Sequence, residues 1–204
     1  MITPAKKLSR LHYTAWLWRI PLFVLMIVEA ASAFNLIKAQ PSFTASGLFL
    51  QSLVFYIFFE TVFHWIRTRH QRVPPWWVAG SLVGLVVLDA LGDYLNWYGT
   101  QTYFDSGLHF LLPAAAVVGY WQLRKTLGLP TTYRFLWFTV APCILTLGAL
   151  YEIEEYLEDY FTGSHRLGDG FDTANDLLMD LLGAFAPIVL VYLYQRARRV
   201  KKPA

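Results

Sequence analysis

Residues 134–156 read RFLWFTVAPCILTLGALYEIEEY, an arginine followed by an almost wholly apolar stretch and then a group of glutamates. A helix that crosses the hydrocarbon core of a bilayer needs about 20 mostly apolar residues. Only a helix satisfies all backbone hydrogen bonds within one isolated span. This segment therefore predicts a membrane-spanning helix, and it is one of six such stretches, at 16–37, 44–66, 76–98, 107–124, 134–156 and 176–196.

The composition supports a membrane protein. Of the 204 residues, 56% are hydrophobic and only 15% are charged, whereas a soluble globular domain has about 25% charged residues. The 12 Tyr, 15 Phe and 8 Trp residues suit side chains that anchor helices at a bilayer surface. The single cysteine, Cys143, excludes an internal disulfide framework. We therefore predict an all-α fold, a polytopic bundle of about six transmembrane helices that forms one domain over residues 1–204.

The basic residues predict how these helices are oriented. Loops on the cytoplasmic side carry an excess of Lys and Arg. With six crossings, fourteen basic residues fall on one side and two, Lys38 and Arg166, on the other. Both termini are therefore expected in the cytoplasm, with the protein in the inner membrane. Because the basic residues alternate with the apolar segments in this way, we read them as a topology signal and expect no nucleic-acid partner. The fourteen are Lys6, Lys7, Arg10, Arg67, Arg69, Arg72, Arg124, Lys125, Arg134, Arg196, Arg198, Arg199, Lys201 and Lys202.

The acidic residues gather on the opposite side. Twelve of the fourteen lie in or beside the expected outer leaflet, and only Glu29 and Glu60 stand apart. Residues three or four apart share one helix face, and ionisable residues within a membrane face the bundle interior and mark functional sites. Four helices thus carry acidic stripes at one depth, namely Asp89/Asp93, Asp105/His109, Glu152/Glu155 and Asp172/Asp176/Asp180.

These stripes need a compensating charge. Arg166, His109 and the neighbouring His165 are the only cationic or potentially cationic groups near them. Either several carboxyls are protonated or a divalent metal ion binds, and the ligand types suit Mg²⁺ or Mn²⁺, or Zn²⁺ or Fe if the histidine coordinates. The candidate metal ligands are Asp105, His109, Glu152, Glu155, Asp172 and Asp176.

Simpler roles are open for several of these residues. Asp105 and Asp172 are placed where an acidic residue would stabilise the start of a helix. His109 could be a hydrogen-bonded core histidine, and the pair Glu60/His64 could extend to the membrane interface. A solvated loop face is the expected role of Glu154, Glu158, Asp159 and Asp169.

Three segments resemble the VanZ-like membrane proteins, and most closely their YjdF-like relatives in the bacterial inner membrane. They are DSGLHF at 105–110, YEIEEY at 151–156 and GFDTANDLLMDLLGA at 170–184. They match the D-x3-H-F, E-x2-E/Q and D-x3-D/N…G-A elements in the same order. This chain departs from VanZ proteins at Asp180, where they generally have asparagine, and Arg166 is only a loose counterpart of their arginine. VanZ is associated with low-level teicoplanin resistance, so the resemblance implies a role in the cell envelope.

Two functions fit these patterns, and a membrane factor in envelope stress or antibiotic resistance is a further alternative. In the first, the chain is a metal-dependent hydrolase or transferase that acts on a membrane lipid or a lipid-linked envelope substrate. A bound metal would polarise the substrate, Asp180 or Asp93 would act as general base, and Arg166 would hold an anionic headgroup. In the alternative, the chain is a non-enzymatic carrier of ions, protons or lipid, in which Glu29 and the Glu60/His64 pair extend a polar route across the bilayer.

Overall fold

The computed structural model describes residues 17–38, 41, 44–164 and 166–200. Within these ranges every regular element is a helix, which confirms the predicted all-α class. The described contacts divide the chain into two units, Met1–Thr102 and Tyr103–Ala204, which we describe separately. Six residues that the sequence analysis used lie outside the described residues, namely Lys6, Lys7, Arg10, His165, Lys201 and Lys202.

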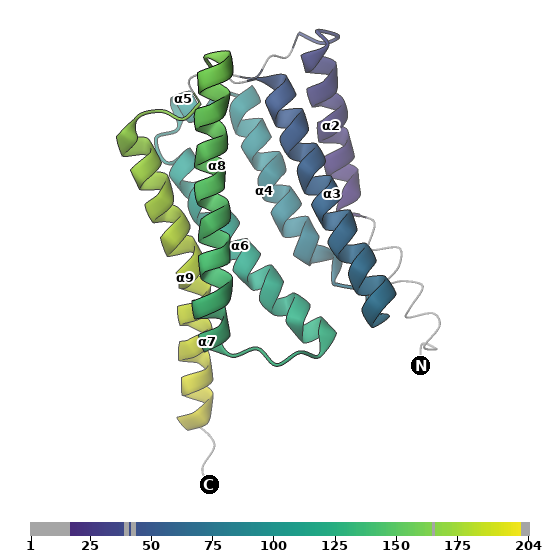
Figure 1. Cartoon of the computed structure of the whole chain (residues 1–204), viewed down its shortest axis with the longest axis vertical. Helices are drawn as coiled ribbons and strands as arrows, with labels where there is room; N and C mark the ends of the chain where they lie inside the picture. Colours follow the sequence, from purple (N-terminus) through teal and green to yellow (C-terminus); the bar gives the residue numbers. More distant parts are fainter. Residues whose placement is uncertain (1–16, 39–40, 42–43, 165, 201–204) are drawn as a thin grey trace. The chain divides into compact units, whose positions relative to one another are not determined.

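The described part of the first unit contains three long helices and one short helix. Helix α2 lies beside α3, and both pack against α4 (Figure 1). Helix α3 begins at a threonine cap, where the side chain of Thr44 accepts a hydrogen bond of 3.1 Å from the backbone N–H of Gly47. Buried Trp18, Leu22 and Val83 belong to the apolar core of this unit. The four helices are α2 (Arg19–Ala33), α3 (Ala45–His70), α4 (Trp76–Tyr94) and α5 (Trp97–Thr100).

The second unit consists of α6 (Phe104–Leu127), a long composite helix, and α9 (Gly170–Val200). The composite helix joins α7 (Tyr133–Phe135), the π-helical segment η1 (Leu136–Val140) and α8 (Ala141–Thr162). Pro142 explains the π segment, because proline has no N–H and its ring crowds the preceding turn of an α-helix. A wider turn relieves this crowding. Helix α6 packs most extensively against α9, and α8 lies beside α9 (Figure 1).

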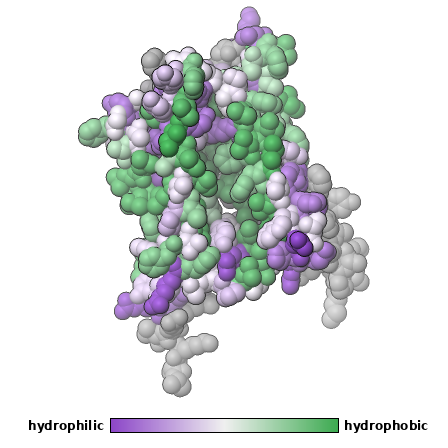
Figure 2. All heavy atoms as spheres, in the orientation of Figure 1, coloured by the Kyte–Doolittle hydropathy of each residue, from purple (hydrophilic) through white to green (hydrophobic). Residues whose placement is uncertain are grey.

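Among the described residues, four helices are long and apolar enough to cross a membrane, at Ala45–His70, Trp76–Tyr94, Tyr133–Thr162 and Gly170–Ala197. They correspond to four of the six predicted spans. The other two predicted spans are helical as well, but α2 has only 15 residues and α6 carries charged residues in both its first and its last turn. On the visible face of each unit, hydrophobic residues cover much of the middle of the helices (Figure 2). The structure therefore supports several membrane-spanning helices, while the count of six and the orientation of the termini stay predictions.

Candidate functional site

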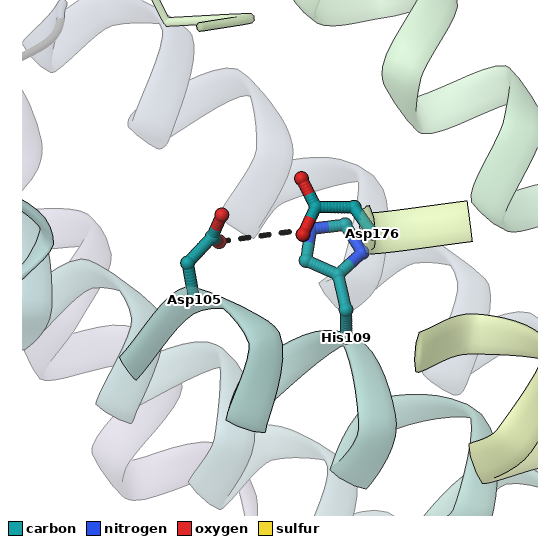
Figure 3. A group of neighbouring side chains, drawn as sticks. All are labelled: Asp105, His109 and Asp176. Atoms are coloured by element: carbon teal, nitrogen blue, oxygen red, sulfur yellow. Dashed lines mark ion pairs between the residues drawn. The ribbon is translucent and has the colours of Figure 1, made fainter. Parts of the chain in front are cut away.

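The candidate site begins at the first turns of α6. Asp105 and His109 are four residues apart and therefore lie on one face of this helix. His109 Nε2 is 3.7 Å from Asp105 Oδ1. Asp176 extends from α9 toward the same point (Figure 3). One ligand atom from each of these three residues lies within 4.8 Å of the others, which is a spacing that could hold a metal ion.

Helix α9 also supplies Asp180, one turn beyond Asp176. Its Oδ1 atom is hydrogen bonded to His109 Nδ1 at 3.3 Å. A second bond between the two helices lies beside the cluster, where Asn175 Nδ2 donates to Ser106 Oγ at 2.7 Å. The histidine is thus held on one ring nitrogen by α9, while its other ring nitrogen faces Asp105.

The third helix, α8, contributes Glu152. Its Oε1 atom is 3.8 Å from His109 Nε2, which is too long for a hydrogen bond. Glu152 is only 5% exposed, and neither of its carboxyl oxygens has a hydrogen-bond partner. Since buried polar groups are almost always hydrogen bonded, this carboxyl needs an explanation. We call the set Asp105, His109, Glu152, Asp176 and Asp180 the acidic cluster.

Two glycines allow the three helices to approach closely enough to form the acidic cluster. A Cβ atom on Gly148 of α8 would collide with the carboxylate of Asp180. A Cβ atom on Gly183 of α9 would collide with the backbone carbonyl of Phe110 on α6. Gly183 lies three residues after Asp180, and Phe110 follows His109. The close contact of α6 with α9 therefore fixes the distance across the site.

Arg166 is occupied by a separate group of acids. Its guanidinium pairs with Glu155 at 2.9 Å and with Glu158 at 3.1 Å, and it also donates a hydrogen bond to the hydroxyl of Tyr151. The carboxylate of Asp159 accepts hydrogen bonds from the backbone N–H groups of Arg166 at 2.6 Å and of the next residue at 2.9 Å. These bonds fix the loop between α8 and α9 against α8. The positive charge of Arg166 is therefore balanced locally.

The structure separates the predicted site residues into those that meet and those that do not. It brings together Asp105, His109, Glu152 and Asp176, with Asp180 as a fifth member. Glu155 faces Arg166 instead. Asp172 is exposed, and its carboxylate lies against Gly168 in the preceding loop. Asp93 belongs to the first unit, where it is buried.

Three residues with structural roles were missed or misread in the sequence. Asp169, expected on a solvated loop face, caps α9 by accepting bonds from Phe171 N at 2.8 Å and Asp172 N at 3.0 Å. Asp159 organises the loop described above. The pattern of an acid followed by glycine and a helical stretch could have identified Asp169 as the cap. Nothing local in the sequence pointed to Gly148, because its role depends on a neighbouring helix.

The acidic cluster combines four carboxyl groups with one imidazole, a set of ligands suited to a divalent cation. In the described part of the chain, Asp105, His109 and Asp176 form the one group of such residues whose ligand atoms converge. The family described as "Predicted membrane protein (DUF2238)" matches residues 19–197, which is most of the chain. The chain belongs to this family.

Membership of the DUF2238 family shows that the chain is an integral membrane protein, in agreement with its apolar helices. A protein of Thermotoga maritima is 26% identical over 145 residues, which cover 67% of this chain and 72% of that protein. That relative is described as an uncharacterized protein. No solved structure matches the chain significantly.

Proposed function

We propose that the second unit binds one divalent metal ion through the imidazole of His109 and the carboxylates around it. The observation that carries this proposal is Glu152, whose two buried oxygens have no hydrogen-bond donor although the ring of His109 lies 3.8 Å away. A cation bound there would satisfy the unpartnered oxygens. Oxygen and nitrogen ligands about 2.1 Å from a metal lie roughly 3 to 3.5 Å from one another. The distances from His109 Nε2 to Asp105 and Glu152, 3.7 and 3.8 Å, are somewhat longer, so the ligands would move closer together on binding. Asp105, Asp176 and Glu152 are the proposed carboxylate ligands.

Asp180 has a different role in this proposal. Histidines that bind a metal through one ring nitrogen generally donate a hydrogen bond from the other to a carboxylate. Because Asp180 Oδ1 lies 3.3 Å from His109 Nδ1, it would hold the imidazole with Nε2 directed at the metal. This geometry favours a positioning role for Asp180 over the general-base role predicted from the sequence. Glu155 and Asp172 have no ligand role in this proposal.

The function that this site supports best is metal-dependent hydrolysis or group transfer on a lipid or lipid-linked envelope substrate. A bound metal would polarise a phosphoryl or acyl oxygen and activate a water molecule. Large exposed aromatic side chains stand at the same helix ends as the cluster, with Tyr103 before α6, Phe161 in the last turn of α8 and Phe171 at the start of α9. Tyrosine side chains such as that of Tyr103 favour the lipid–water interface, so the site would lie where a headgroup can reach it. Since Arg166 is paired with Glu155 and Glu158, and more distantly with exposed Glu154 at 3.9 Å, we assign it to holding the α8–α9 loop.

The same proposal places the protein in the bacterial inner membrane with six helices and both termini in the cytoplasm. It rests on the distribution of basic residues and on the presence of helices at all six predicted positions. The likeness of residues 105–110, 151–156 and 170–184 to VanZ-like and YjdF-like proteins supports an envelope role.

Metal binding is tested with a matched pair of glutamates on α8. Glu152 is buried in the cluster, and Glu154, two residues later, has a side chain that is 53% exposed. The full chain is purified in detergent, stripped with a chelator and titrated with Mn²⁺, and bound Mn²⁺ is counted by electron paramagnetic resonance. We expect one ion per chain in the wild type and in Glu154→Gln, and at least tenfold weaker binding in Glu152→Gln and His109→Ala. Equal binding by all four proteins would refute the metal site.

A transport measurement in vesicles made from bacterial polar lipids then distinguishes the enzymatic proposal from the carrier alternative. We expect the reconstituted wild-type protein to bind Mn²⁺ without moving it into the vesicle lumen. Accumulation of Mn²⁺ inside the vesicles, lost in His109→Ala, would replace the enzymatic proposal with the carrier alternative.

A further inference from the structure

The first unit contains a second buried polar group, formed by α2, α3 and α4. Glu29 of α2 is fully buried at 0% exposure, and Asp89 and Asp93 of α4 are 7% and 2% exposed. Ser32 and Ser52 are buried with them at 1% each. Three acidic side chains in the interior of so small a helical unit are unusual, since acidic residues are almost never fully buried unless they are paired.

The two carboxyls of Asp89 and Glu29 have different surroundings. Both oxygens of Asp89 accept hydrogen bonds, one from the hydroxyl of Tyr98 and one from Gln51 Nε2 at 3.4 Å. Glu29 accepts a single bond, from Ser52 Oγ to Oε1 at 3.1 Å, and its Oε2 atom has no partner. Donors on both oxygens favour the charged form of a carboxyl, whereas burial without them favours the neutral acid. Of these two carboxyls, Glu29 is therefore the one with an oxygen left to carry a proton.

In the described part of the chain, no lysine, arginine or histidine pairs with Glu29. Arg19, at the other end of α2, is paired with Glu60, an ion pair that residue spacing along the sequence does not reveal. The ionisable group that acts on Glu29 is Asp89 of α4, and both Glu29 and Asp93 act on Tyr94 of α4. None of these groups carries a positive charge, and from α3 the contact is the neutral hydroxyl of Ser52.

We propose that the first unit is a proton-binding unit, in which Glu29 carries a proton on Oε2 while Ser52 Oγ donates a hydrogen bond to Oε1. The ligand is a proton because a proton satisfies Glu29 at one oxygen, whereas a metal ion needs several converging ligands. Asp105, His109 and Asp176 are the described residues that converge in that way, and all three belong to the second unit. Buried carboxyls of membrane proteins serve as proton relays. This proposal goes beyond the proposed function and does not depend on metal binding in the second unit.

Infrared spectroscopy of the full chain in lipid tests the proposal, because a protonated carboxyl has a C=O stretching band that an ionised carboxylate lacks. We expect wild-type protein at neutral pH to show this band, and Glu29→Gln to lose a part of it that corresponds to one carboxyl group. Glu154→Gln is the matched control, since the same substitution on an exposed residue should leave the band unchanged. A band of equal intensity in the wild type and in Glu29→Gln would overturn the proposal.

A second variant covers the case in which Glu29→Gln does not fold. Ser52→Ala removes the one hydrogen bond to Glu29, so the C=O band should remain but move in frequency. An unmoved band would show that Glu29 is not the protonated group and would overturn the proposal. The proposal would also be overturned if Na⁺ or Mg²⁺ converted the C=O band to carboxylate bands in the wild type but not in Ser52→Ala. The site would then bind a cation.

Discussion

His109 uses its two ring nitrogens for two purposes. Its Nδ1 atom is bonded to Asp180 at 3.3 Å, and its Nε2 atom faces Asp105 and Glu152 at 3.7 and 3.8 Å. The first distance is that of a hydrogen bond, and the other two are too long for one. This difference separates the residue that orients the imidazole from Asp105 and Glu152, the carboxylates that we propose as metal ligands beside it.

The two aspartates that α9 contributes to the acidic cluster should therefore respond differently to the same substitution. Asp180→Asn should weaken Mn²⁺ binding about 10- to 100-fold, as is typical when a residue that orients a ligand is lost, and keep the stoichiometry of one ion. Asp176→Asn removes a ligand and should abolish binding in the same titration. If Asp180→Asn abolished binding while Asp176→Asn only weakened it, the two assigned roles would be reversed.

Gly148 is a second residue whose role can be tested. Gly148→Ala places a methyl group against the carboxylate of Asp180, and overpacking of this kind costs about 1–3 kcal/mol. We expect a lower midpoint of thermal unfolding in detergent and weaker Mn²⁺ binding. Gly107→Ala is the matched control, because a Cβ atom there meets no atom within 4 Å and alanine favours a helix by up to about 1 kcal/mol. A stabilising Gly148→Ala would show that Asp180 does not need this space.

Glu152 and Glu155 are two residues whose different roles could not be predicted from the sequence. They are three residues apart on one helix, so the sequence assigned both to the metal. In the structure Glu152 faces His109 and Glu155 faces Arg166. The position of Arg166 depends on a loop held by Asp159, and no spacing within α8 contains that information.

Among the elements, α9 begins earlier than its apolar stretch. The span predicted at 176–196 is the membrane-crossing part of a helix that runs from Gly170 to Val200. Hydropathy marks the residues that suit hydrocarbon, whereas the start of a helix is set by the group that accepts its first N–H bonds. Here that group is Asp169, which places Asp172 inside the first turn and Asp176 one turn further.

Removal of this cap should destabilise the second unit. We expect Asp169→Ala to lower the free energy of unfolding by about 0.5–2 kcal/mol, measured by chemical denaturation in mixed micelles. Asp172→Ala is the comparison, since that residue stabilises the helix only through its charge, by about 0.3–1 kcal/mol. The assignment of the cap would fail if Asp172→Ala were the more damaging of the two.

For the whole molecule, the main open prediction is its orientation in the membrane. Phe171 is 89% exposed at the start of α9, and Leu129 is 42% exposed between α6 and α7. Because the basic residues place the α6–α7 connection in the cytoplasm, the two positions should face opposite sides. Cys143 is the single native cysteine, so a Cys143→Ala background allows each to be tested alone.

In that background, Phe171→Cys should react with a membrane-impermeant maleimide in intact cells. Leu129→Cys should react only after the cells are permeabilised. Labelling is read from the mass of the purified protein, with the Cys143→Ala chain as the unlabelled control. The reverse pattern would invert the proposed orientation, and labelling of both positions in intact cells would contradict the six-helix topology.

The amino-acid sequence alone determined that the chain is all-helical and belongs in a membrane, because apolar length and backbone hydrogen bonding are local properties. It also predicted one site for Asp105, His109 and Asp176, since residues at helical spacing lie on one face of a helix and these helix faces lie at a similar depth. Only the tertiary structure decided which carboxyls surround His109 and which neutralise Arg166. That choice depends on how closely α6, α8 and α9 approach at Gly148 and Gly183, and contacts between distant segments leave no periodic pattern in a single sequence.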